Sequence, residues 1–124
     1  MLVEEELTER IIGAAIEVHR TLGPGLLESV YEECLCHELG LRDLKFERQV
    51  ALPLQYKGIS VSVGYRADII VEGAILLELK AVERLLPVHE AQLLTYLRLS
   101  RMRVGLLLNF NTSVMKHGIV RRVL

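Results

Sequence analysis

Two acids and a lysine stand inside the most apolar part of this chain. Residues 65–80, YRADIIVEGAILLELK, form two strand-like runs around a Glu-Gly turn, yet they contain Asp68, Glu78 and Lys80. A buried charge without a partner is costly, so the core of a strand normally excludes these residue types. Either the three lie on a solvated face, where a Glu78–Lys80 ion pair adds little stability, or they converge on a site that needs them.

The geometry of the turn decides between these alternatives. Residues two apart in a strand share a face, so Glu78 and Lys80 point the same way. A two-residue loop at Glu72-Gly73 would turn Asp68 to the opposite face. A three-residue loop ending in Gly73, closed by a glycine bulge, would place Asp68 on the same face as Glu78 and Lys80. The sequence permits both loops.

If the three side chains converge, their chemistry is that of metal-assisted hydrolysis. Two close carboxylates repel each other unless a cation compensates them, and Mg²⁺ prefers oxygen ligands and retains several waters. Such an ion can generate a hydroxide-like nucleophile and neutralise charge on a phosphodiester, while a lysine orients the attacking water. Asp68, Glu78 and Lys80 are the residue types that this reaction requires.

Polar residues on two predicted helices extend the candidate set. On a helix over 26–39, Glu28 and Tyr31 are three residues apart and lie along one stripe. Glu28 is either a third acid of the site or a first-turn acid that the helix dipole favours. On a helix over 88–101, His89, Gln92 and Tyr96 form a second stripe, which either borders the site or is an ordinary polar boundary.

Hydrophobic periodicity gives the remaining elements. Helices are predicted over 6–21, 26–39 and 88–101, and strands over 46–56, 59–71, 74–82, 104–110 and 119–124. The first three strands should form an antiparallel meander, and the apolar strand 104–110 should lie parallel to a neighbour after the crossover helix. The sequence therefore predicts one α/β (α+β) domain over residues 1–124, a mixed β-sheet flanked by helices in the order α-α-β-β-β-α-β-β.

Composition narrows the class of protein. The net charge is −1 and a quarter of the residues are charged, which is typical of a globular domain. The segment 98–122 carries six Arg and Lys residues and no acid, so a locally basic face is expected. No apolar run is long enough to span a membrane and no signal peptide is visible. Cys34 and Cys36 suit free thiols in a reducing cytoplasm, and the high apolar fraction leaves a homodimer open.

The motifs together resemble a known family. Residues 25–31 read G-x-x-E-x-x-Y, and with YRADIIV, ELKAVE and VHEAQLLTYL they make the chain similar to the GxxExxY protein family. The likeness runs from about Thr8 to beyond Asn109. That family is similar in its signature to the PD-(D/E)XK nuclease superfamily, whose restriction-endonuclease-like core has the order α-β-β-β-α-β. The predicted elements reproduce this order after one additional N-terminal helix.

The resemblance implies a metal-dependent nuclease that hydrolyses phosphodiester bonds of nucleic acid, DNA in preference to RNA. It implies that Asp68, Glu78 and Glu28 hold Mg²⁺, or Mn²⁺ in its place, and that Lys80 positions or activates water. Gln92 matches the polar residue that completes such sites, and His89, Tyr96 and Tyr31 are accessory candidates. Ala67 stands where the superfamily often has proline. The alternative is a catalytically silent module of the same fold that binds nucleic acid or protein.

Overall fold

The computed structural model describes residues 4–62 and 64–124 of the chain. The predicted strand 59–71 includes Val63, which lies outside the described residues, as do residues 1–3 of the predicted domain. The elements in chain order are α1 (Glu5–Leu22), α2 (Glu28–Leu41), β1 (Phe46–Ala51), β2 (Leu54–Tyr56), β3 (Ile59–Val61), β4 (Arg66–Val71), β5 (Ile75–Lys80), α3 (Pro87–Ser100), β6 (Val104–Asn109), the 3₁₀ helix η1 (Met115–Gly118) and β7 (Ile119–Val123).

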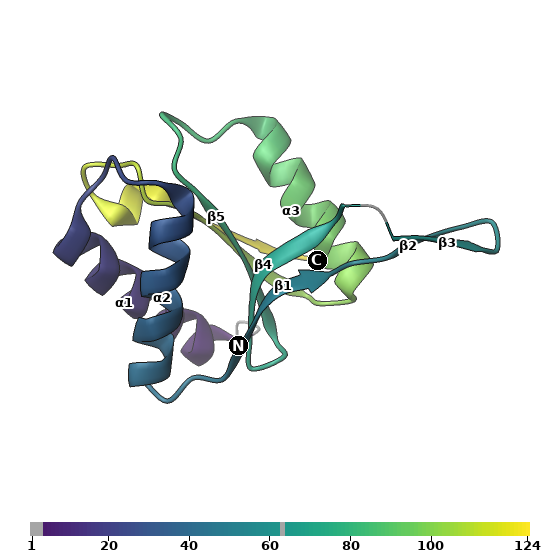
Figure 1. Ribbon diagram of the computed structural model, residues 1–124, viewed down its shortest axis with the longest axis horizontal. Coiled ribbons are helices and arrows are strands. Elements are labelled where there is room, and N and C mark those ends of the chain that lie inside the picture. The colour runs from purple at the N-terminus through teal and green to yellow at the C-terminus, as the bar shows by residue number, and fades with distance from the viewer. Residues whose placement is uncertain (1–3, 63) are drawn as a thin grey trace.

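Five strands form one mixed sheet in the order β1-β4-β5-β6-β7. β5 and β6 are parallel, with α3 as the crossover between them, and the other neighbouring pairs are antiparallel. Figure 1 shows α1 and α2 on one side of this sheet and α3 on the other. The predicted α/β architecture is confirmed. None of the helices in the described part of the chain is both long enough and apolar enough to cross a lipid bilayer.

Each helical layer packs on its own apolar core, and β5 contributes to both. The α1–α2 core includes Leu35 and Leu39 of α2 together with Leu77 and Leu79 of β5. The α3 core includes Leu93 and Leu97 together with Leu76 and Leu107. A central strand covered on both faces must be apolar at successive positions, which explains why residues 75–79 are so hydrophobic. Glu78 is therefore a carboxyl residue within an otherwise apolar stretch of β5.

The connection before α2 differs from the prediction. The helix was predicted to include Leu27, but it begins at Glu28, and Leu27 lies just before it with 73% of its surface exposed. Tyr31 is fully buried instead, with its ring stacked on Phe110 at a centroid distance of 4.6 Å. Its hydroxyl donates to the carbonyl of Gly23 at 2.6 Å and accepts from the N–H of Leu26 at 3.1 Å. Tyr31 thus fixes the turn that leads into Glu28.

Two predicted strands are each broken into two. The predicted strand 46–56 ends as β1 at Ala51 and resumes as β2 after Pro53, whose ring nitrogen cannot donate to a ladder. The predicted strand 59–71 becomes β3 and β4, with Gly64 between them in a left-handed conformation, φ 81°. β2 and β3 form a separate two-stranded sheet, which projects from the rest of the molecule in Figure 1. We call residues 54–61 the β-arm.

Asn109 fixes the chain that follows β5, and its removal should destabilise the fold. The side chain is only 2% exposed; its Nδ2 donates to the carbonyl of Val82 at 2.9 Å, and its Oδ1 accepts from the N–H of Val82 at 3.0 Å. Asn109→Ala should lower the free energy of unfolding by about 2–4 kcal/mol, because two backbone groups lose their partner. Urea unfolding measures this, with half-buried Asn111→Ala as the control that should change stability by less than ~1 kcal/mol.

Candidate active site

The loop between β4 and β5 has three residues. Val71 pairs with Ile75 across this loop, which consists of residues 72–74. Glu72 and Gly73 both have positive φ, 54° and 61°. The predicted three-residue loop ended in Gly73; the observed one lies one residue further along the chain. The register Ile69–Leu77 consequently places Asp68 opposite Glu78, rather than opposite Leu76.

The β4–β5 ladder ends next to Asp68 and Glu78, and beyond it side-chain carboxylates accept the hydrogen bonds of the backbone N–H groups. The regular β4–β5 pairs end at Ile69–Leu77. Beyond them the N–H of Asp68 donates to Oε2 of Glu78 at 2.8 Å, and the N–H of Leu79 donates to Oδ2 of Asp68 at 2.8 Å. Figure 1 shows β4 and β5 diverging from their shared end. Asp68 and Glu78 therefore lie in a fork between two strands, each held by the other strand's backbone.

Burial and mutual repulsion make this pair resist ionisation. Glu78 is 6% exposed, and burial together with the charge of Asp68 raises its pKa to about 8. The pKa of Asp68 is also raised, mainly by burial, against the lowering effect of the Leu79 N–H. Two carboxylates in such surroundings favour either a bound proton or a bound cation. The fork is thus suited to a positive ion.

Lys80 supplies a positive charge next to this pair. It ends β5, is half-buried, and is held at its backbone by the N–H of Phe110, which donates to its carbonyl at 2.9 Å. The ammonium lowers the pKa of Asp68, Glu78 and Glu28, in each case less than burial raises it. The lysine is therefore part of the same electrostatic cluster as the three predicted acids.

Two acids of α2 reach toward this cluster. Glu28 is the first helical residue, and its pKa is raised by burial and by the charges of Asp68 and Glu32. Glu32 lies one turn further along α2, and it also raises the pKa of Asp68. The sequence predicted Glu28 but not Glu32, although their spacing of four residues places both on one face of the helix.

Gln49 is a second residue beside the acids of the fork that the sequence did not predict. This residue of β1 donates from Nε2 to Oε1 of Glu32 at 2.9 Å and lies 3.5 Å from Oδ1 of Asp68. Its position depends on the pairing of β1 with β4, which no local pattern in the sequence specifies. The contact joins α2, β1 and β4 at the fork.

The residues predicted on α3 are divided between two roles. Tyr96 is half-buried; burial and the charges of Glu78 and Asp68 raise its pKa, so it lies beside the acids. Its ring also meets that of Tyr65 edge-on, at a centroid distance of 6.0 Å. His89 accepts at Nδ1 from the N–H of Leu86 at 2.9 Å, which caps the helix. Gln92 is exposed, and no hydrogen bond within residues 4–62 and 64–124 ties it to the acids.

The donor set fits a small, hard cation that keeps its water. Among the described residues, no three side chains of His, Cys, Asp or Glu converge closely enough to hold a metal ion. Mg²⁺ usually binds through one or two carboxylates, with waters and substrate phosphate filling the other positions. Asp68 and Glu78 provide that pair, and each also binds one backbone N–H. Glu28 is not close enough to this pair to act as a third protein ligand of the same ion.

The basic segment of the sequence does not gather at the fork. β5 and β6 are parallel, with Ile75 beside Val104 and Lys80 beside Asn109. Arg101 and Arg103 immediately precede β6, so they lie at the end of the sheet opposite Lys80, about 20 Å or more away along the strands. Arg122 is ion-paired with Glu90. The expectation of one basic face formed by 98–122 therefore does not describe the mouth of the site.

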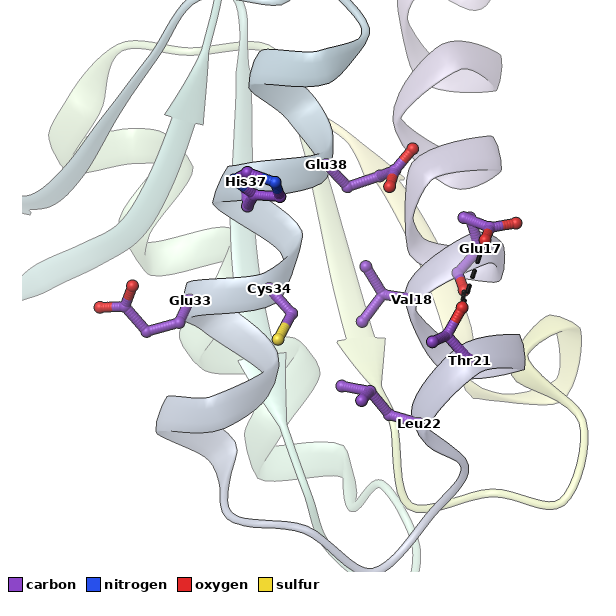
Figure 2. A pocket seen from close by; sticks show the side chains of 8 residues that line it. All are labelled: Glu17, Val18, Thr21, Leu22, Glu33, Cys34, His37 and Glu38. Carbon is purple, nitrogen blue, oxygen red and sulfur yellow. Dashed lines mark hydrogen bonds between the residues drawn. The ribbon is translucent and has the colours of Figure 1, made fainter.

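A separate apolar hollow lies between α1 and α2. Figure 2 shows Val18, Leu22 and Cys34 directed into this space of about 250 Å³. The acids that line it are ion-paired, as Glu17 is with Arg20 and Glu38 with Arg42. It shares none of its lining residues with the fork, and its surroundings provide apolar contact rather than a catalytic arrangement.

The two cysteines behave as the sequence predicts. Both are free thiols, and Cys36 is buried. Burial raises the pKa of the Cys36 thiol to about 11, so it is protonated at neutral pH and a poor nucleophile or metal ligand.

Comparison with known proteins agrees with this arrangement. No curated protein and no solved structure matches the sequence or the fold of this chain. The sequence profile described as the PD-(D/E)XK nuclease superfamily matches residues 5–123. Enzymes of this superfamily typically use divalent metal ions. The match covers nearly the whole chain, including both strands of the fork and all three long helices. The chain therefore belongs to the PD-(D/E)XK nuclease superfamily.

Proposed function

We propose that this protein is a metal-dependent nuclease of the GxxExxY type, which hydrolyses phosphodiester bonds in DNA. The observation that carries the proposal is the fork, where half-buried Asp68 and buried Glu78 lie opposite each other, with Lys80 next to them. A structural ion pair would not need two carboxylates so placed that each raises the cost of charging the other. A superfamily whose members are nucleases supplies the reaction class.

The residues divide the work as follows. Asp68 and Glu78 would hold Mg²⁺ or Mn²⁺; when bound, such an ion polarises the phosphate and lowers the pKa of water. Lys80 would orient the attacking water in line with the departing oxygen and stabilise the negative charge on the phosphate oxygens in the transition state. Glu28 would accept a hydrogen bond from water near the ion. Gln92 and Tyr96 on α3 would contact the substrate from the opposite side of the fork.

Cations near the fork are needed to meet the negative backbone of DNA. Arg66 opens β4 two residues before Asp68 and is exposed, and its guanidinium donates to the carbonyl of Gln49 at 3.4 Å. Its ability to donate several hydrogen bonds at once suits a phosphate group. We propose Arg66, rather than the basic segment 98–122, as the first phosphate contact beside the site.

Cleavage assays test the proposal directly. Supercoiled plasmid, single-stranded DNA and RNA should be incubated with the protein and Mg²⁺, Mn²⁺ or EDTA. Metal-dependent cleavage of DNA is expected, and Asp68→Asn should abolish it. Asp43→Asn is the matched control, because Asp43 is the other aspartate of the chain and lies exposed after α2. Absence of cleavage by the folded protein with either metal would favour the silent binding module instead.

The β-arm supports a homodimer. Its strands pair Leu54 with Val61 and Tyr56 with Ile59, so these four apolar side chains share one face. Tyr56 and Ile59 are 56% and 59% exposed, and none of the four belongs to either core. An isolated two-stranded sheet is marginally stable in water, so this face needs a cover. We propose a second copy, because two identical apolar faces complement each other.

Substitution within the β-arm should dissociate the dimer. Tyr56→Ser with Ile59→Ser removes most of the apolar contact and should weaken dimerisation by about 10²-fold or more, as measured by sedimentation velocity over a range of concentrations. The control is Gln55→Ala with Ser60→Ala on the polar face, where the two side chains bind each other at 3.2 Å. A wild-type protein that remains monomeric at high micromolar concentration contradicts this prediction.

A further inference from the structure

Gln49 has a backbone conformation that its neighbours must enforce. It lies in the middle of β1 with φ 50°, in the left-handed region that a side chain other than glycine rarely occupies. The β1–β4 pairs Arg48–Ile69 and Val50–Ala67 flank it, but Gln49 and Asp68 do not form a regular pair. Such a conformation is strained, and residues strained in this way concentrate at functional sites. Gln49 interrupts the ladder directly beside Asp68.

The side chain of Gln49 bridges two carboxylates. Its Nε2 donates to Oε1 of Glu32 at 2.9 Å and reaches Oδ1 of Asp68 at 3.5 Å. Because ionised carboxylates only accept hydrogen bonds, the amide nitrogen and not the oxygen must face both partners. The shorter bond anchors the amide, and the longer one aims its second N–H at Asp68. The hydrogen bond from Gln49 lowers the pKa of Asp68.

This contact completes the fixation of Asp68. The N–H of Leu79 donates to Oδ2 of Asp68 at 2.8 Å, and the amide of Gln49 faces Oδ1. Neighbouring residues therefore hold both oxygens of this carboxylate. The anchor is itself held, since Glu32 accepts from Arg48 at 2.9 Å and is mostly buried. Arg48, Glu32 and Gln49 thus form a chain of charged and polar contacts that runs from β1 through α2 to the fork.

We propose that Gln49 is a positioning residue, anchored by Glu32, that orients the Asp68 carboxylate for a divalent cation. The inference rests on the proposed metal-dependent function. It adds that tight binding of the cation requires Gln49 as well as the two carboxylates. Groups that orient a metal ligand are typically worth 10–100-fold in metal affinity. The strain at Gln49 is consistent with this scheme, because a strained backbone persists only where its surroundings hold it, and the Gln49 side chain is held by Glu32 and directed at Asp68.

Two substitutions of Gln49 separate positioning from a structural role. Gln49→Gly removes the amide and relieves the strain, whereas Gln49→Met removes the amide but keeps the length of the side chain and the strain. Both should weaken Mn²⁺ binding by about 10–100-fold in isothermal titration calorimetry. The melting temperature of the metal-free protein should be unchanged or higher for glycine and nearly unchanged for methionine. Gln55→Met in the β-arm is the matched control and should bind Mn²⁺ like the wild type.

Glu32 provides a rescue test. Glu32→Ala releases the anchor of Gln49 and should weaken Mn²⁺ binding to a similar extent, whereas Glu32→Gln keeps an oxygen that accepts from Gln49 and should restore most of the affinity. Unchanged Mn²⁺ affinity in the Gln49 variants, or loss of affinity only in step with loss of fold, overturns the positioning role and leaves the nuclease proposal intact. Absence of Mn²⁺ binding to the wild type overturns both.

Discussion

Replacing Lys80 with methionine is expected to lower the rate of DNA cleavage by about 10³-fold, because a positioned charged group acts in the transition state more than in the ground state. The methionine keeps the length and apolar body of the side chain, which is half-buried at the end of β5. It removes the ammonium that acts on Asp68 and Glu78. Initial rates at saturating Mn²⁺ measure the effect, and circular dichroism checks the fold.

The matched control for this substitution is Lys116→Met. Lys116 lies exposed in η1, outside the fork, and its variant should cleave at close to the wild-type rate. Retention of more than a tenth of the wild-type rate by Lys80→Met would show that the lysine does not act in the reaction. Equal loss in both variants would indicate a general electrostatic effect on DNA binding, which the dependence of the rate on salt concentration would reveal.

Replacing Glu78 with glutamine is expected to abolish cleavage and, at the same time, to stabilise the metal-free protein. The wild-type side chain is buried and has a pKa raised from 4.5 to about 8. At pH 8.5 the wild-type fold therefore holds a second, destabilising negative charge next to Asp68. The neutral amide removes that charge and can still accept the hydrogen bond from the N–H of Asp68, so the free energy of unfolding should rise by an amount on the order of 3 kcal/mol.

The same pKa shift fixes the sign of the pH dependence. Below pH 4.5 Glu78 is protonated in both the folded and the unfolded chain, so its ionisation does not lower the free energy of unfolding. Between pH 4.5 and about 8 the unfolded chain releases this proton more readily than the folded one, so the stability of the metal-free protein falls as pH rises. The raised pKa of Asp68 acts in the same direction. Above about pH 8 Glu78 is ionised in both the folded and the unfolded chain, so the loss of stability is complete.

Urea unfolding of the wild type and of Glu78→Gln from pH 5 to 9 measures this effect. The two curves should lie close together at pH 5 and separate as pH rises, with the variant more stable. Adding Mg²⁺ should stabilise the wild type most at high pH, where both carboxylates are ionised, and should have little effect on the variant. A variant that is less stable than the wild type at pH 8.5 contradicts the placement of Glu78 in a carboxylate pair that Lys80 compensates only in part.

The sequence was sufficient to predict the layers of the fold and the acids of the fork, for identifiable reasons. Apolar runs of strand length and two clear breaks around Gly23 and Gly73 define the elements, and charged residues are conspicuous within a strand as apolar as 75–80. The alternation of side chains limited the position of Asp68 to two alternatives, which the loop register decided. Periodicity is a local property of the sequence. It predicts which residues of a strand share a face, but not where two paired strands diverge.

The features that the sequence did not reveal depend on tertiary contacts. Gln49 acquires its place from the pairing of β1 with β4 and from Glu32 on α2, and its left-handed φ has no signature in its residue type. The β-arm continues the alternation of the neighbouring strands through Pro53, so it resembles part of the main sheet. The basic segment was expected to form one basic face because its charge is concentrated in sequence, whereas the parallel register carries Arg101 and Arg103 to the end of the sheet far from Lys80.

The most direct test of the central claim is an anomalous diffraction map from crystals of the protein grown with Mn²⁺. The account predicts a peak in the fork, with one oxygen each from Asp68 and Glu78 at about 2.2 Å and the remaining ligands mostly water. The Asp68→Asn variant should lose that peak under the same conditions. A map with no peak in the fork, or with Mn²⁺ held by other side chains while Asp68 and Glu78 share a proton, would contradict the assignment of this pair as the metal site.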